Sequence, residues 1–305
     1  MLETYVLLKG GASSERNVSL WTAATITESL GRLGVHFVEI DALDQDWLEK
    51  IIALAPRCVV ISLHGPFGED GTVQKLLEEQ SIKYSGSTSL VSALAIDKQA
   101  TKKMVAQLEI AVPYSENTVL HGIPSWEGEY PVVVKPNKEG SSFGVVIAKD
   151  KNEMKAAVQA AFQYGQDVLL EEYIEGKELS CGVINLFGKI QALPLIEIKP
   201  KQGFFDFSAK YTAALCEEVC PANLEKSITE KIQGQSAHIF EYLNISQYAR
   251  IDWILKEGKP YFLEINTLPG MTKTSLINKE LAVAGIPFDL FIKHLISVQM
   301  YILLK

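Results

Sequence analysis

Charged and amide side chains recur on two neighbouring runs late in the sequence. Arg250 and Asp252 lie in one run of β-branched and aromatic residues, and Glu264 and Asn266 lie in a second run after a turn at residues 256–258. This composition predicts two paired strands, and because alternate residues of a strand share a face, each pair lies on one face. Two carboxylates at close range repel each other unless a cation lies between them. Mg²⁺ fits this role, because it prefers hard oxygen ligands.

The length of the turn decides whether the two pairs share a face. A three-residue turn, with Gly258 at the position that needs positive φ, puts all the even-numbered residues on one side. A two-residue turn shifts the register by one and separates the pairs. The apolar odd-numbered residues are expected on the buried side: Ile251, Trp253, Leu263 and Ile265.

Two interpretations of this hairpin remain open. One is a metal site, and the other is an exposed hairpin whose Arg250–Asp252 pair is a weak surface salt bridge. Residues 267–272 break the strand and present backbone amides, which favours a site.

A lysine and a small-residue loop indicate phosphate binding. Lys135 ends an apolar run, where a buried ammonium group costs free energy unless an anion lies beside it. The alternative is a lysine whose stem extends to solvent. The loop at residues 140–144 contains Ser141 and Ser142, and its amides and hydroxyls suit either the covering of phosphates or a plain hairpin turn.

Acidic residues surround a short segment after the apolar run at residues 168–170. Glu171, Glu172 and Glu178 flank Tyr173 and Ile174. An extended segment that leaves a strand can pair its backbone with an adenine ring while a carboxylate accepts from ribose hydroxyls. The alternative is that these acids are solvated.

A long irregular stretch at residues 201–212 is more typical of a functional loop than of a linker. It contains Lys210 and Tyr211, which form either a basic and aromatic pair of a lid or an exposed loop tip. Composition does not separate these two alternatives.

The N-terminal third alternates strands with helices, which predicts a parallel α/β sheet. Ligands of such sheets bind beyond the carboxyl ends of the strands. Two polar loops leave those ends, one holding Glu15 and one beginning at His64. The first loop is Gly-rich but lacks the GxGxxG spacing and the GK[ST] sequence, so it is weak evidence for nucleotide binding. The second loop serves equally well as a plain turn.

The pattern of elements predicts an α/β and α+β chain with three domains. The boundaries are expected near residues 95 and 180, which gives units at residues 1–95, 96–180 and 181–305. The second unit is expected to contain a hairpin of strands at 131–136 and 145–148. The third is expected to contain antiparallel strands at 179–187 and 190–198.

Composition restricts the class of protein. The 305 residues are 47% apolar and 22% charged, as in an ordinary soluble protein, and a net charge of −8 argues against a nucleic-acid partner. No signal peptide or membrane-length apolar run is evident, so a cytoplasmic protein without a membrane partner is expected. Cys58 and Cys181 are expected as core thiols. Cys216 and Cys220 have no second Cys or His pair nearby, which disfavours a metal site or disulfide.

Four motifs resemble one known family. They are HGPFGEDGT at residues 64–72, VKPNKEGSSFGV at 134–145, FDFSAKY at 205–211, and RID at 250–252 with EINTLPGMT at 264–272. In this order they resemble the D-alanine–D-alanine ligases of the ATP-grasp superfamily. The resemblance covers nearly the whole chain, and its last motif is highly specific. It implies a three-domain ATP-grasp fold with an N-terminal parallel-sheet domain, and ATP held between the central and C-terminal sheets.

The resemblance implies roles for the nucleotide site. Two Mg²⁺ ions, or Mn²⁺ in their place, bridge the ATP phosphates and are held by Asp252, Glu264 and Asn266. The phosphates are contacted by Lys98, Lys135, Ser142 and Lys210. The adenine and ribose are held by Glu171, Glu172, Tyr173, Ile174 and Glu178.

The resemblance also implies how two D-alanine molecules are joined through an acyl phosphate for peptidoglycan precursors. Glu15 anchors the first ammonium group, with His64 nearby, and Ser141 and Tyr211 link with Glu15 to close a lid. The second carboxylate lies on Ser275 and Leu276. The oxyanion is stabilised by Arg250 and the Gly270 N–H.

Some positions depart from the family pattern, namely Asn17, Lys75, Phe205, Phe207 and Asn278. None of these is an implied metal or phosphate ligand, so activity is still expected. Tyr211 favours D-alanine as the second substrate over D-lactate or D-serine, which a related ligase would use. A non-catalytic nucleotide-binding protein is the alternative from another class, and a homodimer is the assembly that the resemblance suggests.

Overall fold

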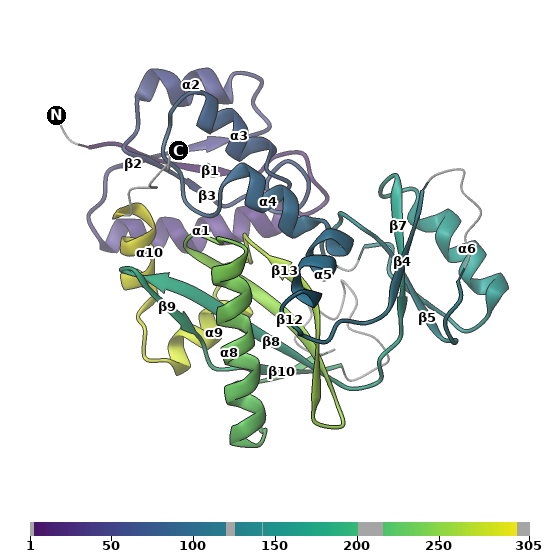
Figure 1. Ribbon diagram of the computed structural model, residues 1–305. Coiled ribbons are helices and arrows are strands. Elements are labelled where there is room, and N and C mark those ends of the chain that lie inside the picture. The colour runs from purple at the N-terminus through teal and green to yellow at the C-terminus, as the bar shows by residue number, and fades with distance from the viewer. Residues whose placement is uncertain (1–2, 120–125, 142, 201–215, 298–305) are drawn as a thin grey trace.

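The computed structural model describes residues 3–119, 126–141, 143–200 and 216–297, and it contains three sheets (Figure 1). The first sheet is parallel, in the order β2–β1–β3, and is formed by β1 (Tyr5–Lys9), β2 (Phe37–Asp41) and β3 (Cys58–Ile61). The helices α1 (Arg16–Arg32) and α2 (Trp47–Leu54) connect these strands. β1 and β3 are apolar and buried, as expected for a parallel sheet covered on both faces.

The second sheet is antiparallel, in the order β4–β7–β5–β6. Its strands are β4 (Ser115–Val119), β5 (Val132–Pro136), β6 (Val146–Ala148) and β7 (Asp167–Glu172). The helix α6 (Lys151–Ala161) packs on β5 and β6, and its apolar residues share a core with those strands. The predicted hairpin of β5 and β6 is confirmed.

The third sheet has the order β11–β10–β8–β12–β13, and β9 also pairs with β8. Its strands are β8 (Lys177–Leu186), β9 (Lys189–Ala192), β10 (Ile196–Pro200), β11 (Cys216–Val219), β12 (Tyr248–Lys256) and β13 (Lys259–Asn266). The helix α8 (Lys226–Tyr242) covers one face. The prediction of one strand at 190–198 is wrong, because Pro194 lies between β9 and β10 and proline has no N–H for a ladder.

The remaining helices join the sheets. They are α3 (Thr72–Glu79), α4 (Ser89–Ile96), α5 (Lys98–Ala106), α9 (Leu276–Val283) and α10 (Phe288–Ser297). The helix α10 packs on α1 and β3, so the end of the described chain returns to the first sheet. An ion pair of 2.7 Å between Arg32 and Asp289 joins α1 to α10.

The β12–β13 hairpin has the two-residue turn, yet its two pairs of polar residues share one face. Glu257 and Gly258 form a two-residue turn with φ of 48° and 78°, since Lys256 pairs with Lys259. One irregularity after Asp252 then restores the shared face, because Asp252 pairs with Glu264 and Arg250 with Asn266. The prediction that Leu263 is buried with the odd-numbered residues is wrong. Leu263 is the extra residue and is half-buried, and its neighbour Phe262 enters the core instead.

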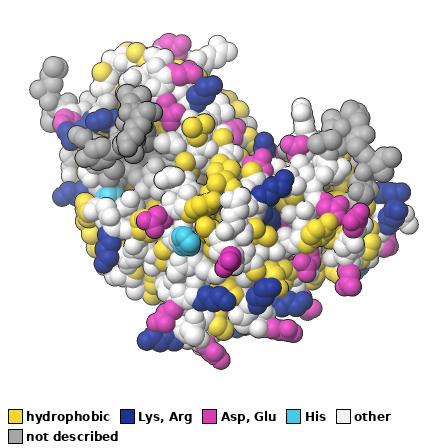
Figure 2. Space-filling model, in the orientation of Figure 1, with side chains coloured by type: hydrophobic (Ala, Val, Ile, Leu, Met, Phe, Trp, Pro, Cys, Tyr) yellow, Lys and Arg dark blue, Asp and Glu magenta, His cyan; other side chains and the backbone are white. Residues whose placement is uncertain are grey.

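One face of the molecule carries charges of both signs, and the cysteines are free. On the face in Figure 2, Lys and Arg side chains are interspersed with Asp and Glu. All four cysteines are free thiols, and Cys58 and Cys181 lie in the core as expected. Within the described residues, no helix has the length and apolar character needed to cross a bilayer.

Candidate active site

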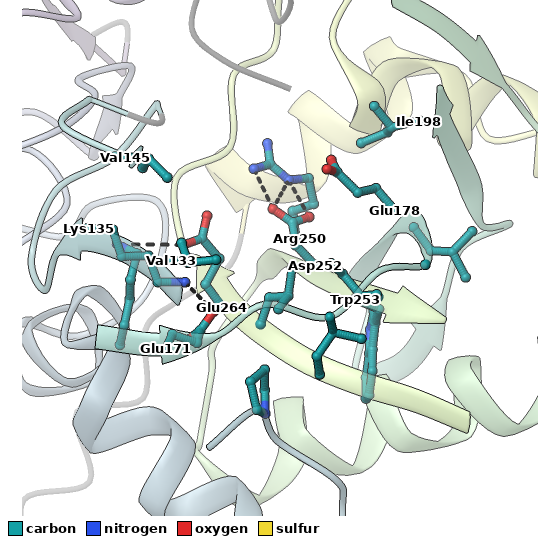
Figure 3. A pocket seen from close by; sticks show the side chains of 18 of the residues that line it. Val133, Lys135, Val145, Glu171, Glu178, Ile198, Arg250, Asp252, Trp253 and Glu264 are labelled. Atoms are coloured by element: carbon teal, nitrogen blue, oxygen red, sulfur yellow. Dashed lines mark hydrogen bonds and ion pairs between the residues drawn. The ribbon is translucent and has the colours of Figure 1, made fainter. Parts of the chain in front are cut away.

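Two cavities adjoin between the sheets. The larger has a volume of about 710 Å³ and is lined by residues of β5 and β7 on one side and of β8, β10, β12 and β13 on the other (Figure 3). The smaller has a volume of about 70 Å³ and reaches Glu15 and His64, in the loops that follow β1 and β3. Residues that line both cavities include Lys98, Arg250, Glu264 and Gly270.

Arg250 and Asp252 form a two-pronged ion pair on the cavity side of β12. Arg250 Nε lies 2.9 Å from Asp252 Oδ1, and Arg250 Nη2 lies 2.9 Å from Asp252 Oδ2. Ser180 Oγ of β8 donates to Asp252 Oδ1 over 2.9 Å, and Ser180 is fully buried. Sequence reasoning missed Ser180, since it lies 72 residues away from Asp252 and only the sheet register makes them opposite.

Glu264 and Asn266 complete a set of oxygen donors suited to a divalent cation. Glu264 Oε2 lies 3.5 Å from Lys98 Nζ, and Asn266 Oδ1 accepts from the Leu268 N–H over 3.1 Å. The side chains of Arg250 and Lys98 balance the charge of the two carboxylates. The donors are hard oxygens on one face of a hairpin beside a cavity, so they fit Mg²⁺ with further ligands from a polyphosphate.

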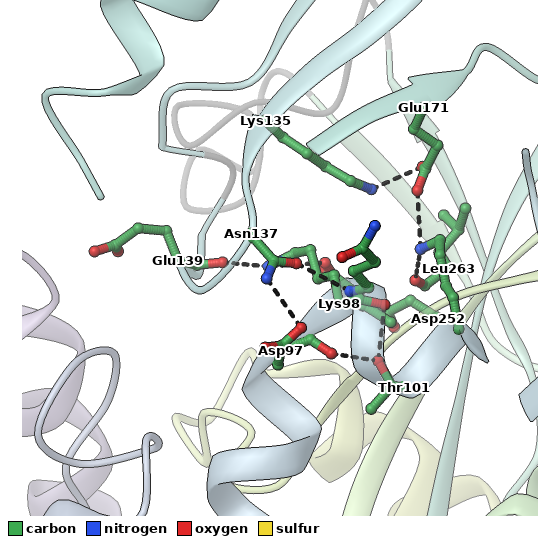
Figure 4. Close-up of polar contacts among 12 residues, drawn as sticks. Asp97, Lys98, Thr101, Lys135, Asn137, Glu139, Glu171, Asp252 and Leu263 are labelled. Atoms are coloured by element: carbon green, nitrogen blue, oxygen red, sulfur yellow. Dashed lines mark hydrogen bonds and ion pairs between the residues drawn. The ribbon is translucent and has the colours of Figure 1, made fainter. Parts of the chain in front are cut away.

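Lys98 is fixed at the start of α5 by a capping arrangement (Figure 4). Asp97 Oδ1 accepts from the Ala100 N–H and from Asn137 Nδ2, both over 2.9 Å. Asn137 Oδ1 in turn accepts from the N–H of Gln99 over 2.9 Å, and Lys98 Nζ donates to the Glu139 carbonyl over 2.5 Å. Sequence reasoning missed Asp97 and Asn137, although an Asp before a helix is a recognisable N-cap signal.

Glu171 lies in a buried ionic cluster in the wall of the large cavity. Its Oε1 lies 2.7 Å from Lys135 Nζ and its Oε2 lies 2.9 Å from Lys102 Nζ. Burial acts to raise the pKa of Glu171, but the two ammonium groups outweigh it and hold the pKa below its ordinary value. Lys135 is 7% exposed and points to Glu171, so the solvent-extended alternative for this lysine is wrong. Lys102 was not predicted from the sequence.

The other residues predicted for the base and ribose line the same cavity. They are Glu172, Tyr173, Ile174 and Glu178. Ile174 is buried, Tyr173 is half-buried, and Glu172 is exposed with its Oε2 accepting from the Tyr114 N–H over 3.3 Å. The chain therefore presents apolar and acidic side chains together along this wall.

Glu15 connects the start of α1 to the loop that follows β5. It lies at the N-terminal end of α1, is 5% exposed, and accepts a hydrogen bond from Ser141 Oγ. A Cβ atom at Gly65 would lie 2.8 Å from Glu15 Oε2, and one at Gly140 would lie 3.0 Å from it. Glycine at both positions therefore lets two loops approach this carboxylate.

His64 is enclosed in a hydrogen-bonded network. Its Nδ1 lies 2.8 Å from the Leu268 carbonyl, so Nδ1 carries the proton that is donated there. Its Nε2 lies 3.0 Å from Thr22 Oγ1 and accepts from that hydroxyl, while Thr22 Oγ1 accepts from the Met271 N–H over 3.2 Å. Both ring nitrogens are thus hydrogen-bonded to protein groups. Nδ1 contacts Leu268 directly and Nε2 contacts Met271 through Thr22, so the two links lie on either side of Gly270.

The segment after Gly270 is held by local hydrogen bonds. Ser275 Oγ accepts from the Thr272 N–H over 2.9 Å and precedes Leu276, the first residue of α9. Asn278 Nδ2 donates to the carbonyls of Met271 (3.1 Å) and Thr272 (2.7 Å). Asn278, a departure from the family pattern, therefore stabilises this loop. Asn17 and Lys75, two further departures, are exposed.

The structure thus brings most of the predicted site residues to the two cavities. The predictions for Ser142, Phe205, Phe207, Lys210 and Tyr211, and for the loop at 201–212, lie outside the described residues. Among the described His, Cys, Asp and Glu residues, no group of three is placed to hold a metal ion. The hairpin offers two carboxylates and an amide instead, which is the pattern of a site completed by the ligand.

Comparisons with known proteins agree with this arrangement. A family model described as D-ala D-ala ligase C-terminus matches residues 104–297. The chain is 39% identical to a D-alanine–D-alanine ligase of Syntrophotalea carbinolica, over 95% of this chain and 94% of that protein. A crystal structure of the Bacillus anthracis D-alanine–D-alanine ligase complexed with ATP superposes with a TM-score of 0.84 at 31% identity, covering 97% of this chain and 96% of that chain. A D-Ala:D-Ser ligase of Enterococcus faecalis superposes with a TM-score of 0.82 at 27% identity, covering 97% and 99%.

Proposed function

Because the chain belongs to the D-alanine–D-alanine ligase family, with the ATP-grasp fold, we propose that its two cavities bind ATP and two D-alanine molecules side by side. The chain is a carboxylate–amine ligase that uses ATP to form D-alanyl-D-alanine. The structural observation that carries the proposal is the shared wall of the two cavities, which contains Lys98, Arg250, Glu264 and Gly270. A phosphoryl group that moves from one cavity to the other passes these residues.

The large cavity suits the nucleotide. Glu171 and Glu178 offer acceptors for the amino group of a base and for ribose hydroxyls, and Tyr173 and Ile174 offer an apolar surface to the ring. Lys98 and Lys135 supply positive charge for the phosphates. Glu172 contributes to the same wall.

The hairpin donors suit Mg²⁺, which we propose as the cofactor, with Mn²⁺ as a substitute. Asp252, Glu264 and Asn266 would hold the ions. When bound, they would neutralise phosphate charge and favour transfer of the phosphoryl group. Arg250, now paired with Asp252, would then turn its guanidinium toward the reacting oxygens, because the ion replaces its charge at the carboxylate.

The small cavity suits the amino acids. The Glu15 carboxylate would hold the ammonium group of the first D-alanine, and Ser141 would keep Glu15 in place. The carboxylate of this D-alanine attacks the terminal phosphorus of ATP, and the products are an acyl phosphate and ADP. The amine of the second D-alanine then attacks the acyl carbon, and phosphate leaves as the new amide forms.

Two groups would stabilise the oxyanion of the second step, namely the Arg250 guanidinium and the Gly270 N–H. Ser275 and the backbone at Leu276 would hold the carboxylate of the second D-alanine. His64 would act through the loop that carries Gly270, because both of its ring nitrogens bond to protein groups. The protein mainly aligns reactants, which can supply effective molarities of roughly 10⁵–10⁸ M.

The setting of the enzyme is proposed on the same basis. The chain would be divided into three units, at residues 1–95, 96–180 and 181–305. The product would serve peptidoglycan synthesis in the cytoplasm, and the enzyme would be a homodimer.

The direct test is phosphate release from ATP and Mg²⁺ with D-alanine, and with L-alanine as the control. We expect D-alanine-dependent release together with D-alanyl-D-alanine. The absence of turnover with D-alanine would overturn the proposal. Release that needs D-lactate or D-serine as the second substrate would instead assign the chain to a related ligase.

A further inference from the structure

A lysine that no substrate can reach lies behind the wall of the large cavity. Lys102 of α5 is 2% exposed, and its ammonium group lies 2.9 Å from Glu171 Oε2. The same ammonium group donates to the Leu263 carbonyl and lies 5.8 Å from the centre of the Phe262 ring. Lys102 therefore joins the second sheet, through β7, to the third sheet, through β13.

The Leu263 carbonyl is available to Lys102 because of the irregularity in β13. Leu263 is the extra residue between the pairs Asp252–Glu264 and Trp253–Phe262, so it has no partner residue on β12. Such a residue leaves the ladder locally disrupted. Lys102 thus joins the residue before Glu264 to the Glu171 carboxylate.

The two lysines that contact Glu171 differ in access to the ligand. Lys135 lines the cavity with Glu171, whereas Lys102 is enclosed by α5, β7 and β13. A polyphosphate in the cavity attracts Lys135 away from Glu171. A buried carboxylate that loses its only cation is strongly disfavoured. Lys102 is the cation that stays.

We propose that Lys102 is a positioning residue that keeps Glu171 ionised and fixed as the acceptor for a 6-amino purine, and thereby sets the preference for ATP over GTP. This inference rests on the proposed function of the large cavity. Each Glu171 oxygen faces one ammonium group and has a second lone pair for a ligand N–H. Adenine presents an amino group at its 6-position, whereas guanine presents an oxygen that a carboxylate repels.

The test compares Lys102→Met with Lys103→Met, because Lys103 is the exposed neighbour on the same helix. Binding of Mg²⁺–ATP and Mg²⁺–GTP is measured by calorimetry without D-alanine, and turnover with D-alanine is measured separately. We expect Lys102→Met to weaken ATP binding and to lower the ATP-to-GTP affinity ratio by about tenfold or more. The reason is that a site built to hydrogen-bond one ligand group strongly rejects an analogue that leaves the site's polar group unpaired. In turnover, the KM for ATP rises more than kcat falls. Lys103→Met leaves the ratio unchanged.

Glu171→Gln and the double variant Lys102→Met with Glu171→Gln separate a positioning role from a general structural one. If Lys102 acts through Glu171, the double variant has the same ATP-to-GTP ratio as Glu171→Gln alone. Independent, additive effects on the ratio would overturn the inference, as would an unchanged ratio in Lys102→Met. If Lys102→Met does not fold, Glu171→Gln decides, because an unchanged ratio there removes the acceptor on which the inference depends. A preference for ATP over GTP in a protein that does not turn over D-alanine would contradict the proposed ligase function, but it would still support the role of Lys102.

Discussion

Asp252 faces Glu264 across the β12–β13 pair because one extra residue, Leu263, interrupts the register between them. With the two-residue turn alone, Asp252 would pair with Leu263, and Glu264 would pair with Ile251 and point into the core. The irregularity therefore places both carboxylates on the cavity side. The proposed metal site therefore depends on a defect in the ladder and not only on the alternation of residues.

The first prediction concerns this carboxylate pair. Glu264→Gln keeps the shape of the side chain but removes one charged oxygen donor, so Mn²⁺ should bind far more weakly in the presence of ATP. We expect a loss on the order of 100-fold in kcat/KM, since a metal contact contributes several kcal/mol. Mn²⁺ binding is measured by electron paramagnetic resonance. Glu241→Gln, an exposed acid on α8, is the control, and equal Mn²⁺ affinity in the two variants would refute the assignment.

The second prediction concerns Thr22, whose hydroxyl joins the Met271 N–H to His64. Thr22→Val leaves both groups buried without a partner, which costs about 1–3 kcal/mol of folding free energy. Because these groups flank Gly270, kcat should fall about tenfold, the equivalent of 1.4 kcal/mol. Thr22→Ser should restore both values.

Thr25→Val is the matched control for Thr22→Val, because the Thr25 hydroxyl donates to the Trp21 carbonyl of its own helix. Stability is measured by denaturant unfolding and kcat by phosphate release. A drop in stability with no change in kcat would limit Thr22 to a structural role.

The sequence predicts the parts of this molecule that depend on local periodicity. The buried strands of the first sheet, the β5–β6 hairpin and the pairing of β12 with β13 follow from apolar runs and alternation. The break between β9 and β10 could also have been predicted from Pro194, because proline cannot continue a central ladder.

The sequence does not predict contacts that depend on distant segments. Ser180 reaches Asp252 only through the pairing of β8 with β12, and Lys102 reaches Glu171 only when α5 packs against β13. The irregularity at Leu263 is of the same kind. Its carbonyl finds Lys102 and Phe262 enters the core, and neither partner is a neighbour in sequence. Residue types near these positions therefore carried no signal of the contact.

The third prediction concerns Asn278, which donates to the carbonyls of Met271 and Thr272. Asn278→Ala removes both bonds and should cost about 1–3 kcal/mol, at about 1 kcal/mol for each hydrogen bond. Because the loop leads to Ser275, the KM for the second D-alanine should rise more than kcat falls. Steady-state kinetics with varied D-alanine provide the measurement. Asn17→Ala, at an exposed position, is the control, and the same KM in both variants would contradict the role of Asn278.

The fourth prediction concerns Glu280 of α9, which is fully buried and accepts from the Gly182 N–H over 2.9 Å. Burial raises the pKa of Glu280 to about 8, with Asp252 adding to the rise and Gly182 and Arg250 opposing it. In the unfolded chain the pKa of a glutamate is about 4.3. Between these values the folded state holds a proton that the unfolded state releases, so stability declines as pH rises from about 4.3 to 8.

Glu280→Gln tests this directly, because the amide keeps the acceptor for Gly182 and cannot ionise. Each pKa unit of difference is worth about 1.4 kcal/mol, so the wild-type protein should lose a few kcal/mol across this window that the variant retains. Denaturant unfolding at several pH values gives the slope, and Glu241→Gln should follow the wild type. If Glu280→Gln has the wild-type slope, the carboxyl group is already ionised in the folded protein, and Arg250 rather than a proton balances its charge.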